Sequence, residues 1–194
     1  MEAMLSILVG VGLAAATGFR IFVPPLILSL AARSGHVELA SSLEWLASDA
    51  ALWSFAAATL LEVGAYYVPW LDNLLDTVAT PAAVVAGVLV TGSMTGDLSP
   101  WLRWSVAVLA GGGTAAVFQG LTAGSRVISS ATTLGLANPL VATLEAVASV
   151  VLTVLSISFP LLLVIALGAL FWLAATRIAG RFGSRRRSVV ADTG

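Results

Sequence analysis

The feature that most constrains this chain is a series of apolar runs, each about as long as a helix that crosses a membrane. Such a helix needs about 20 apolar residues. The chain has room for six of these runs: Met4–Ala32, Ala50–Pro69, Pro81–Gly96, Leu102–Gly124, Pro139–Ile157 and Pro160–Ile178. Only 10% of the residues are charged, against about 25% in soluble domains. The sequence therefore predicts an all-α integral membrane protein with about six transmembrane helices.

The predicted organisation is one transmembrane domain over residues 1–180, followed by a basic, disordered tail over residues 181–194. Arg177, Arg181 and residues 185–187 form an arginine cluster after the last run. The positive-inside rule places this cluster in the cytoplasm. An even number of crossings then places the N-terminus there as well, and the loop over residues 33–49 outside. The N-terminus has no basic region or cleavage site, so we interpret it as the first helix.

Two stripes of small residues point to an internal duplication. Small residues four apart share one helix face and allow another helix to approach closely. The stripes precede Arg20 and Arg126, and they consist of Gly10, Ala14 and Gly18, and of Gly112, Ala116, Gly120 and Gly124. We expect the first and fourth helices to cross through these stripes. The repeats would cover about residues 4–98 and 99–180, and three crossings per repeat would make them inverted.

Charged residues inside the apolar runs, or next to them in the sequence, are the candidate site. A charge at bilayer depth is costly, and it normally faces a cavity or a partner of opposite charge. Gly18 and the prolines at 24 and 25 flank Arg20, so the first run is a candidate for a broken or re-entrant helix. The candidate residues for binding a substrate or ion are Arg20, Glu62, Asp72, Asp76, Arg126 and Glu145.

These six residues admit two interpretations. The arginines would hold an anionic group, and the carboxylates would carry protons or cations. Alternatively, the buried charges are structural ion pairs, Arg126 anchors the helix at the inner surface, and the two aspartates are solvated helix caps. The sequence leaves both interpretations open.

The composition excludes several classes of chemistry. The chain has no cysteine and no lysine, and its one histidine, His36, lies in a polar loop. A disulfide, a thiolate or multi-histidine metal site and a Ser-His-Asp triad are therefore excluded within one chain. We expect no catalytic residues, no metal and no cofactor, although an intramembrane enzyme that uses only carboxylates is a third possibility. A net charge of −1 gives no field that would attract nucleic acid.

Four separated motifs resemble a bacterial membrane-protein family known as domain of unknown function 4126. They are Gly-Leu-Ala-Ala-Ala-Thr-Gly-Phe-Arg at 12–20, Asp-Asn-Leu-Leu-Asp-Thr-Val-Ala-Thr-Pro at 72–81, Ala-Gly-Gly-Gly at 110–113 and Ala-Asn-Pro-Leu-Val-Ala-Thr-Leu-Glu at 137–145. The resemblance covers about residues 4–180. It implies a multi-pass protein of the bacterial inner membrane, and it brings no activity and no site residues with it.

The expected function is transport or channel-like passage of a small solute or ion through a polar site between the repeats. The alternative is a membrane protein that does not transport but binds lipid or a protein partner, with its charges as structural pairs. Membrane lipids are the expected surroundings in both cases. The spans provide little material for a gated pathway, which is compatible with a homodimer.

Overall fold

A computed structural model describes residues 2–65, 69–134, 136–169, 172, 173 and 176, and the side chains of all of these except 69–77. Within these residues the chain is helical and contains no strand. Its labelled elements are α1 (Glu2–Thr17), α2 (Val23–Arg33), the 3-10 helix η1 (Ser41–Ala47), α3 (Asp49–Ala65), α4 (Pro69–Met94), α5 (Pro100–Val106), the π-helical turn η2 (Ala107–Gly112), α6 (Gly113–Thr133) and α7 (Asn138–Ser158). A short helix over Pro160–Ala169 follows.

Two of the described helices are long and apolar enough to cross a membrane. One is the continuous helix Pro100–Thr133, which joins α5, η2 and α6, and the other is α7. The pair η1 and α3, bent by 61°, would make a third span. The remaining apolar helices, including α1 and α2, are shorter. These properties are those of an integral membrane protein.

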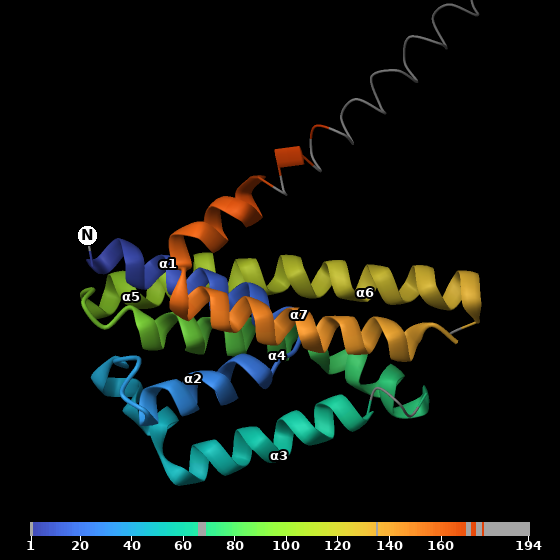
Figure 1. The fold of residues 1–194 in the computed structure, drawn as a ribbon, viewed down its shortest axis with the longest axis horizontal. Helices are drawn as coiled ribbons and strands as arrows, with labels where there is room; N and C mark the ends of the chain where they lie inside the picture. Colours follow the sequence, from blue (N-terminus) through green and yellow to red (C-terminus); the bar gives the residue numbers. More distant parts are fainter. Residues whose placement is uncertain (1, 66–68, 135, 170–171, 174–175, 177–194) are drawn as a thin grey trace, which may run out of the picture.

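The first apolar run folds into a hairpin of two helices, and α2 returns alongside α1 (Figure 1). Val9 and Leu13 of α1 pack with Leu28 of α2 and Val90 of α4 in one buried cluster. Near the start of α1, the Ser6 hydroxyl donates a hydrogen bond to Asp97, with 3.4 Å between the oxygens. Beyond α2, the Ala40 N–H donates to the Ser93 carbonyl at 2.7 Å. Both ends of the hairpin therefore lie at the same end of the bundle.

This hairpin corrects the prediction of a single crossing over Met4–Ala32. The chain stops being helical after Thr17, and α2 begins with two prolines near its first positions. Proline suits the first turn of a helix, because an N–H there has no partner inside the helix. The break and the reversal fall where the sequence has Gly18 and its neighbouring prolines. The hairpin also brings the loop over residues 33–49 to the same end as the N-terminus, which contradicts the predicted opposite placement.

The hairpin also removes the predicted inversion between the two Gly…Arg motifs. Along α1, Gly10 lies against Thr91 of α4, and Thr91 in turn lies against Gly111. Further along α1, Gly18 lies against Ala115 and Phe118 of α6. Residue numbers thus increase in the same direction along both helices, so α1 and α6 run parallel. The reason is that α2 returns toward the start of α1, which adds one more reversal of the chain between the two motifs.

The first stripe, which runs from Gly10 to Gly18 just past the end of α1, faces two different helices. A Cβ added at Gly10 would lie 2.9 Å from Thr91 Cγ2, and one added at Gly18 would lie 2.8 Å from the Ala115 carbonyl oxygen. Ala14, between them, is fully buried. Residues four apart in a helix are offset by about 40° around its axis, so the stripe turns from α4 toward α6 as it advances.

The same drift explains why the second stripe does not meet α1 as predicted. Gly112 lies near Val88 of α4, and Ala116 is half-buried. At Gly120 and Gly124, a Cβ would have no atom of the described residues within 4 Å, and both glycines are exposed. From Gly112 to Gly124 the stripe rotates by about 120°, and this rotation carries its end away from the bundle interior.

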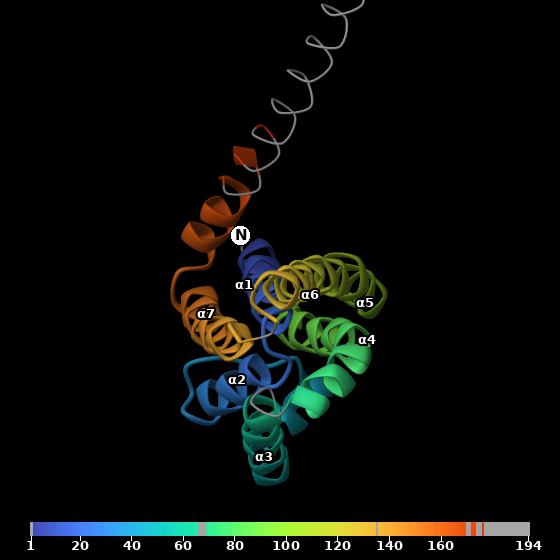
Figure 2. The ribbon, with the colours of Figure 1, turned by 90° about the vertical axis from the view of Figure 1, so that its right-hand side faces the viewer.

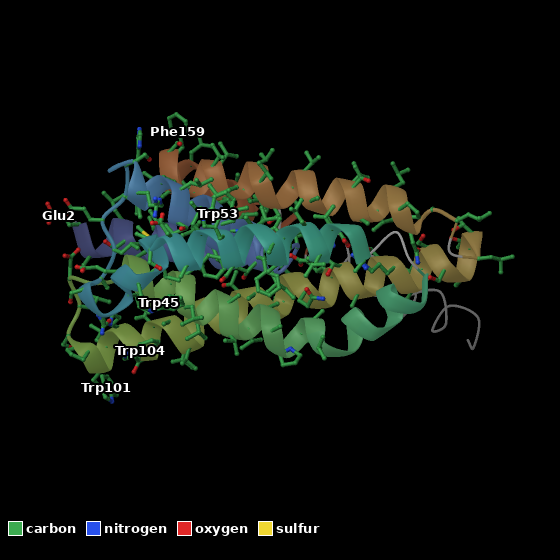
Figure 3. All side chains as sticks on the ribbon, turned by 90° about the horizontal axis from the view of Figure 1, so that it is seen from below. Glu2, Trp45, Trp53, Trp101, Trp104 and Phe159 are labelled. Atoms are coloured by element: carbon green, nitrogen blue, oxygen red, sulfur yellow. The ribbon has the colours of Figure 1, made fainter. Side chains whose placement is uncertain are left out.

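The hairpin lies inside the bundle, and α3 lies at its edge (Figure 2). Helix α1 packs against α4, α6 and α7, whereas the buried residues of α3 are only Ala51, Glu62 and Ala65. Four tryptophans, Trp45, Trp53, Trp101 and Trp104, gather toward one end of the bundle with Glu2 and Phe159 (Figure 3). We call this the aromatic end. Tryptophan is enriched where a membrane protein meets the lipid headgroups.

Candidate functional site

The tip of the α1–α2 hairpin brings four of the six candidate charges together. Arg20 lies in the break between α1 and α2, Glu62 on α3, Arg126 on α6 and Glu145 on α7. Each of the four residues is at most 6% exposed. We call this group the tip cluster. Charged side chains are almost never fully buried unless they are paired, so the contacts within the cluster decide what it can do.

Glu145 is shared by both arginines. Its Oε2 atom forms ion pairs with Arg126 Nη2 and, at 3.4 Å, with Arg20 Nη2. Its Oε1 atom accepts a hydrogen bond from Arg126 Nε at 3.4 Å. Arg20 Nη2 also donates to the backbone carbonyl of Ala142, one turn earlier on α7. A single carboxylate on α7 thus connects the hairpin tip to α6.

Glu62 binds the start of α2. Its Oε1 accepts the Ile21 N–H at 2.7 Å, and its Oε2 accepts the Phe22 N–H at 3.1 Å. A helix N-terminus has unpaired N–H groups and a partial positive charge, and a carboxylate satisfies both. Glu62 therefore caps α2 from a different helix and places a second carboxylate in the cluster.

The carbonyl groups of the break are also satisfied from neighbouring helices. The Ala16 carbonyl accepts hydrogen bonds from the N–H groups of Phe19 and Arg20, and at 3.0 Å from the Ser149 hydroxyl of α7. The Gly18 carbonyl receives the Thr122 hydroxyl of α6 at 3.5 Å. Non-helical backbone is tolerated at membrane depth only where such partners surround it. Sequence reasoning missed Thr122 and Ser149, and their only signal was a hydroxyl near a charged residue on each helix.

A row of polar side chains on α6 leads from the tip cluster toward the end of that helix. Thr122, Arg126, Ser129 and Thr133 recur three or four residues apart and so share a face. The first three are buried. The Ser129 hydroxyl has no hydrogen-bond partner among the described residues, although the Ser129 carbonyl accepts the Thr133 hydroxyl at 2.7 Å. A buried hydroxyl of this kind is a place where a water or an ion finds a partner.

The remaining two candidates, Asp72 and Asp76, lie on α4. Their side chains are outside the described part of the structure. No three of the described His, Cys, Asp and Glu residues come together in a group that would hold a metal ion. The tip cluster is therefore an arrangement of two carboxylates and two guanidinium groups, and with all four ionised its net charge is zero.

Comparison with known proteins gives a family and nothing on function. A family model described as "Domain of unknown function (DUF4126)" matches residues 7–179. Neither the curated proteins nor the solved structures contain a match to the chain. The arrangement of the tip cluster is thus the principal guide to what the protein does.

Proposed function

The chain belongs to the DUF4126 family, and we propose that it is a small transporter or channel-like protein for a small solute or ion, with the tip cluster as its polar site. The observation behind this proposal is a set of four charged side chains buried at the tip of a broken helix, inside an apolar bundle. In transporters, substrate and ion sites near the bilayer midplane are typically formed by discontinuous helices. Ionisable residues inside a membrane usually mark an ion or substrate pathway.

The proposed membrane arrangement has four crossings and one hairpin, in place of six crossings in inverted repeats. Helix α3, helix α4, the continuous helix Pro100–Thr133 and helix α7 cross the bilayer. The α1–α2 hairpin enters and leaves from the aromatic end. The surroundings are the bacterial inner membrane, with the N-terminus in the cytoplasm. The arginine-rich tail lies outside the described residues, so its cytoplasmic position stays a prediction from the sequence.

The cluster suggests how a substrate would be bound. Glu145 is the only described carboxylate that contacts both arginines, so an anionic substrate that displaced it would meet two guanidinium groups. Protonation of Glu145 would weaken the same contacts. In either case the hairpin tip would lose the ion pair that connects it to α6 through Glu145, one of several contacts that bind it to α6 and α7. The polar row on α6 would then provide the route between the cluster and the end opposite the aromatic end.

The alternative function is a membrane protein that does not transport, and specific observations favour it as a rival. Glu62 is bound to two backbone N–H groups, and the carbonyls of the break are also occupied. A cluster whose only role is to stabilise the hairpin would have the same contacts. The protein would then act through its surface, by binding lipid or a partner.

Flux measurements separate the two functions. The purified protein is placed in liposomes with pH-sensitive and anion-sensitive dyes, and wild type is compared with Arg20→Gln. The control is Arg33→Gln, because Arg33 lies at the surface and pairs with the exposed Asp49. Transport predicts a flux in wild type and in the control that Arg20→Gln abolishes, while thermal melting shows that the variant is folded. Absence of proton or ion movement in the wild type under every gradient would contradict the proposal.

A further inference from the structure

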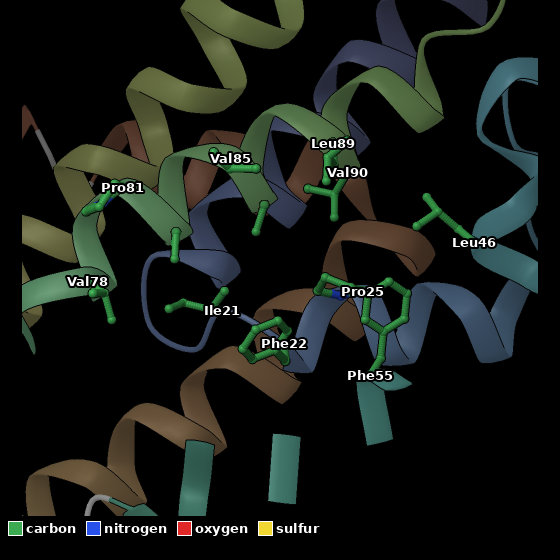
Figure 4. Close-up of a pocket in the computed structure, with 12 residues that line it drawn as sticks. Ile21, Phe22, Pro25, Leu46, Phe55, Val78, Pro81, Val85, Leu89 and Val90 are labelled. Atoms are coloured by element: carbon green, nitrogen blue, oxygen red, sulfur yellow. The ribbon is translucent and has the colours of Figure 1, made fainter. Parts of the chain in front are cut away.

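An apolar pocket lies beside the hairpin tip, between α2, α3, α4 and η1 (Figure 4). Its volume is about 460 Å³, which is within the range of small-molecule sites. Every side chain that lines it is apolar, including Ile21 and Phe22 at the tip, Phe55 on α3 and Leu46 on η1. A polar ligand would find no side-chain partner there, and burying its polar groups would be unfavourable.

The pocket has the length of one lipid chain. Its wall on α4 extends from Val78 to Val90, a rise of about 18 Å along a helix. The hydrocarbon core of a bilayer is about 30 Å thick, so the chains of one leaflet occupy about 15 Å. Lining residues recur three or four apart along this wall and form one continuous face. A single extended chain therefore matches both the shape and the chemistry of the pocket.

One end of the pocket lies at the aromatic end of the bundle. Leu46 follows Trp45 in η1, and the ring of Trp45 lies 6.5 Å from that of Phe55, another lining residue. The opposite end reaches Ile21 at the hairpin tip. Val78 and Val85 lie at a side opening of the pocket, where the exposed fractions of these residues are 51% and 58%. These side chains face the surroundings of the bundle, which for a membrane protein are lipid chains.

We propose that this pocket binds one acyl chain of a phospholipid from the leaflet at the aromatic end. The headgroup lies at the level of Trp45, and the chain extends along α4 to the hairpin tip. There it contacts Ile21 and Phe22, whose N–H groups are bound by Glu62. The bound chain therefore packs against the side chains of the segment whose N–H groups Glu62 binds. This inference does not rest on transport.

Photo-crosslinking tests the site and its direction. The protein is placed in vesicles of phosphatidylethanolamine and phosphatidylglycerol that contain a trace of phospholipid with a diazirine in one acyl chain. One probe has the diazirine near the ester, and the other has it at the chain end. We expect the first to label residues near Leu46 and Phe55, and the second to label residues near Ile21 and Val78. Labelling there should exceed labelling of the outer face of α7 several-fold.

Variants supply the controls. Ala86→Phe fills the pocket and should reduce its labelling several-fold, whereas Val147→Phe, on the lipid-facing side of α7 at 56% exposure, should leave it unchanged. If Ala86→Phe does not fold, Val85→Phe narrows the exposed mouth and replaces it. Equal labelling of the pocket and α7, or labelling unaffected by filling the pocket, would overturn the proposal. So would a reversed order of the two probes.

Discussion

Replacing Glu145 by glutamine should strongly destabilise the bundle. Glutamine has nearly the same shape and retains one acceptor, but it has no negative charge. Arg20 and Arg126 both form ion pairs with Glu145, and both are almost fully buried. The variant removes both of these ion pairs and leaves Glu62 in the cluster. The change therefore tests how much the shared carboxylate contributes to the stability of the folded bundle.

The expected loss of stability follows from the burial of Arg20 and Arg126. Removing one member of a buried ion pair costs about 3–5 kcal/mol, because the other member stays buried and charged. Two buried arginines each lose an ion pair here, so we expect the free energy of unfolding to decrease by an amount in this range, about 3–5 kcal/mol. Adding Arg126→Gln removes one of the two positive charges that paired with Glu145. The double variant should therefore regain about 1–3 kcal/mol relative to Glu145→Gln alone.

Unfolding by a denaturing detergent in mixed micelles, followed by tryptophan fluorescence, measures these differences. The matched control is Asp49→Asn. It breaks the ion pair between Arg33 and Asp49, which has an N–O distance of 2.6 Å and side chains 36% and 78% exposed. An exposed pair contributes less than about 1 kcal/mol. If Glu145→Gln lowers stability no more than the control does, or if the double variant is the less stable of the two, the reasoning is refuted.

Two further predictions test the fold. The chain has no native cysteine, so single cysteines introduced at Glu2, Ser34 and Leu136 report the side of the membrane on which each position lies, through labelling with an impermeant maleimide. The hairpin predicts that the cysteines at positions 2 and 34 are labelled from one side and the cysteine at position 136 from the other. A continuous first span would instead place positions 2 and 136 on the same side. Gly18→Ala should lower the melting temperature, because its Cβ would lie 2.9 Å from the Gln119 backbone nitrogen. Gly120→Ala, which meets no described atom within 4 Å, should leave the temperature unchanged or raise it, because alanine favours a helix by about 1 kcal/mol over glycine.

The sequence identifies which side chains belong to the tip cluster but not how they pair. Arg20, Glu62 and Glu145 are conspicuous because each is a charge within an apolar run, and Arg126 because it follows directly after one. Their pairing depends on how four separate elements pack, and Glu145 lies far from Arg20 in the chain. A local pattern contains no information on such a contact. The shared position of Glu145 therefore emerges only from the three-dimensional arrangement.

The sequence marks the first run as a candidate for a broken or re-entrant helix, but hydropathy does not record direction and so does not show that the chain turns back. A run of apolar residues reads the same whether the chain continues through the membrane or turns back within it. Two signals were nevertheless present. The run Met4–Ala32 is longer than the about 20 residues that one crossing needs, and it contains a glycine and two adjacent prolines near its middle. Length and helix breakers together are a better indication of a re-entrant segment than either one alone.

The small-residue stripes show a different limit of sequence patterns. A four-residue spacing predicts a shared helix face over two turns, and the contacts of Gly10 and Gly18 show that this face already turns from α4 to α6 within α1. Over the three steps from Gly112 to Gly124 the accumulated rotation is about 120°. Long stripes of this spacing therefore cannot mark a single straight interface. A prediction of helix contact from such a stripe therefore has to consider the number of four-residue steps as well as the spacing.

The charge balance of the tip cluster limits how it can work. Its described ionisable groups are two guanidinium groups and two carboxylates, and a proton or ion that enters this buried site alone would change its net charge at low dielectric, which is unfavourable. Passage therefore requires that a charge within the cluster move at the same time. Glu62 is tied to the backbone of α2 and Arg20 belongs to the hairpin itself, so such a movement would shift the tip. Under the proposed transport function, passage through this site and movement of the α1–α2 hairpin would be one event, and fixing the hairpin should abolish flux even with all four charges present.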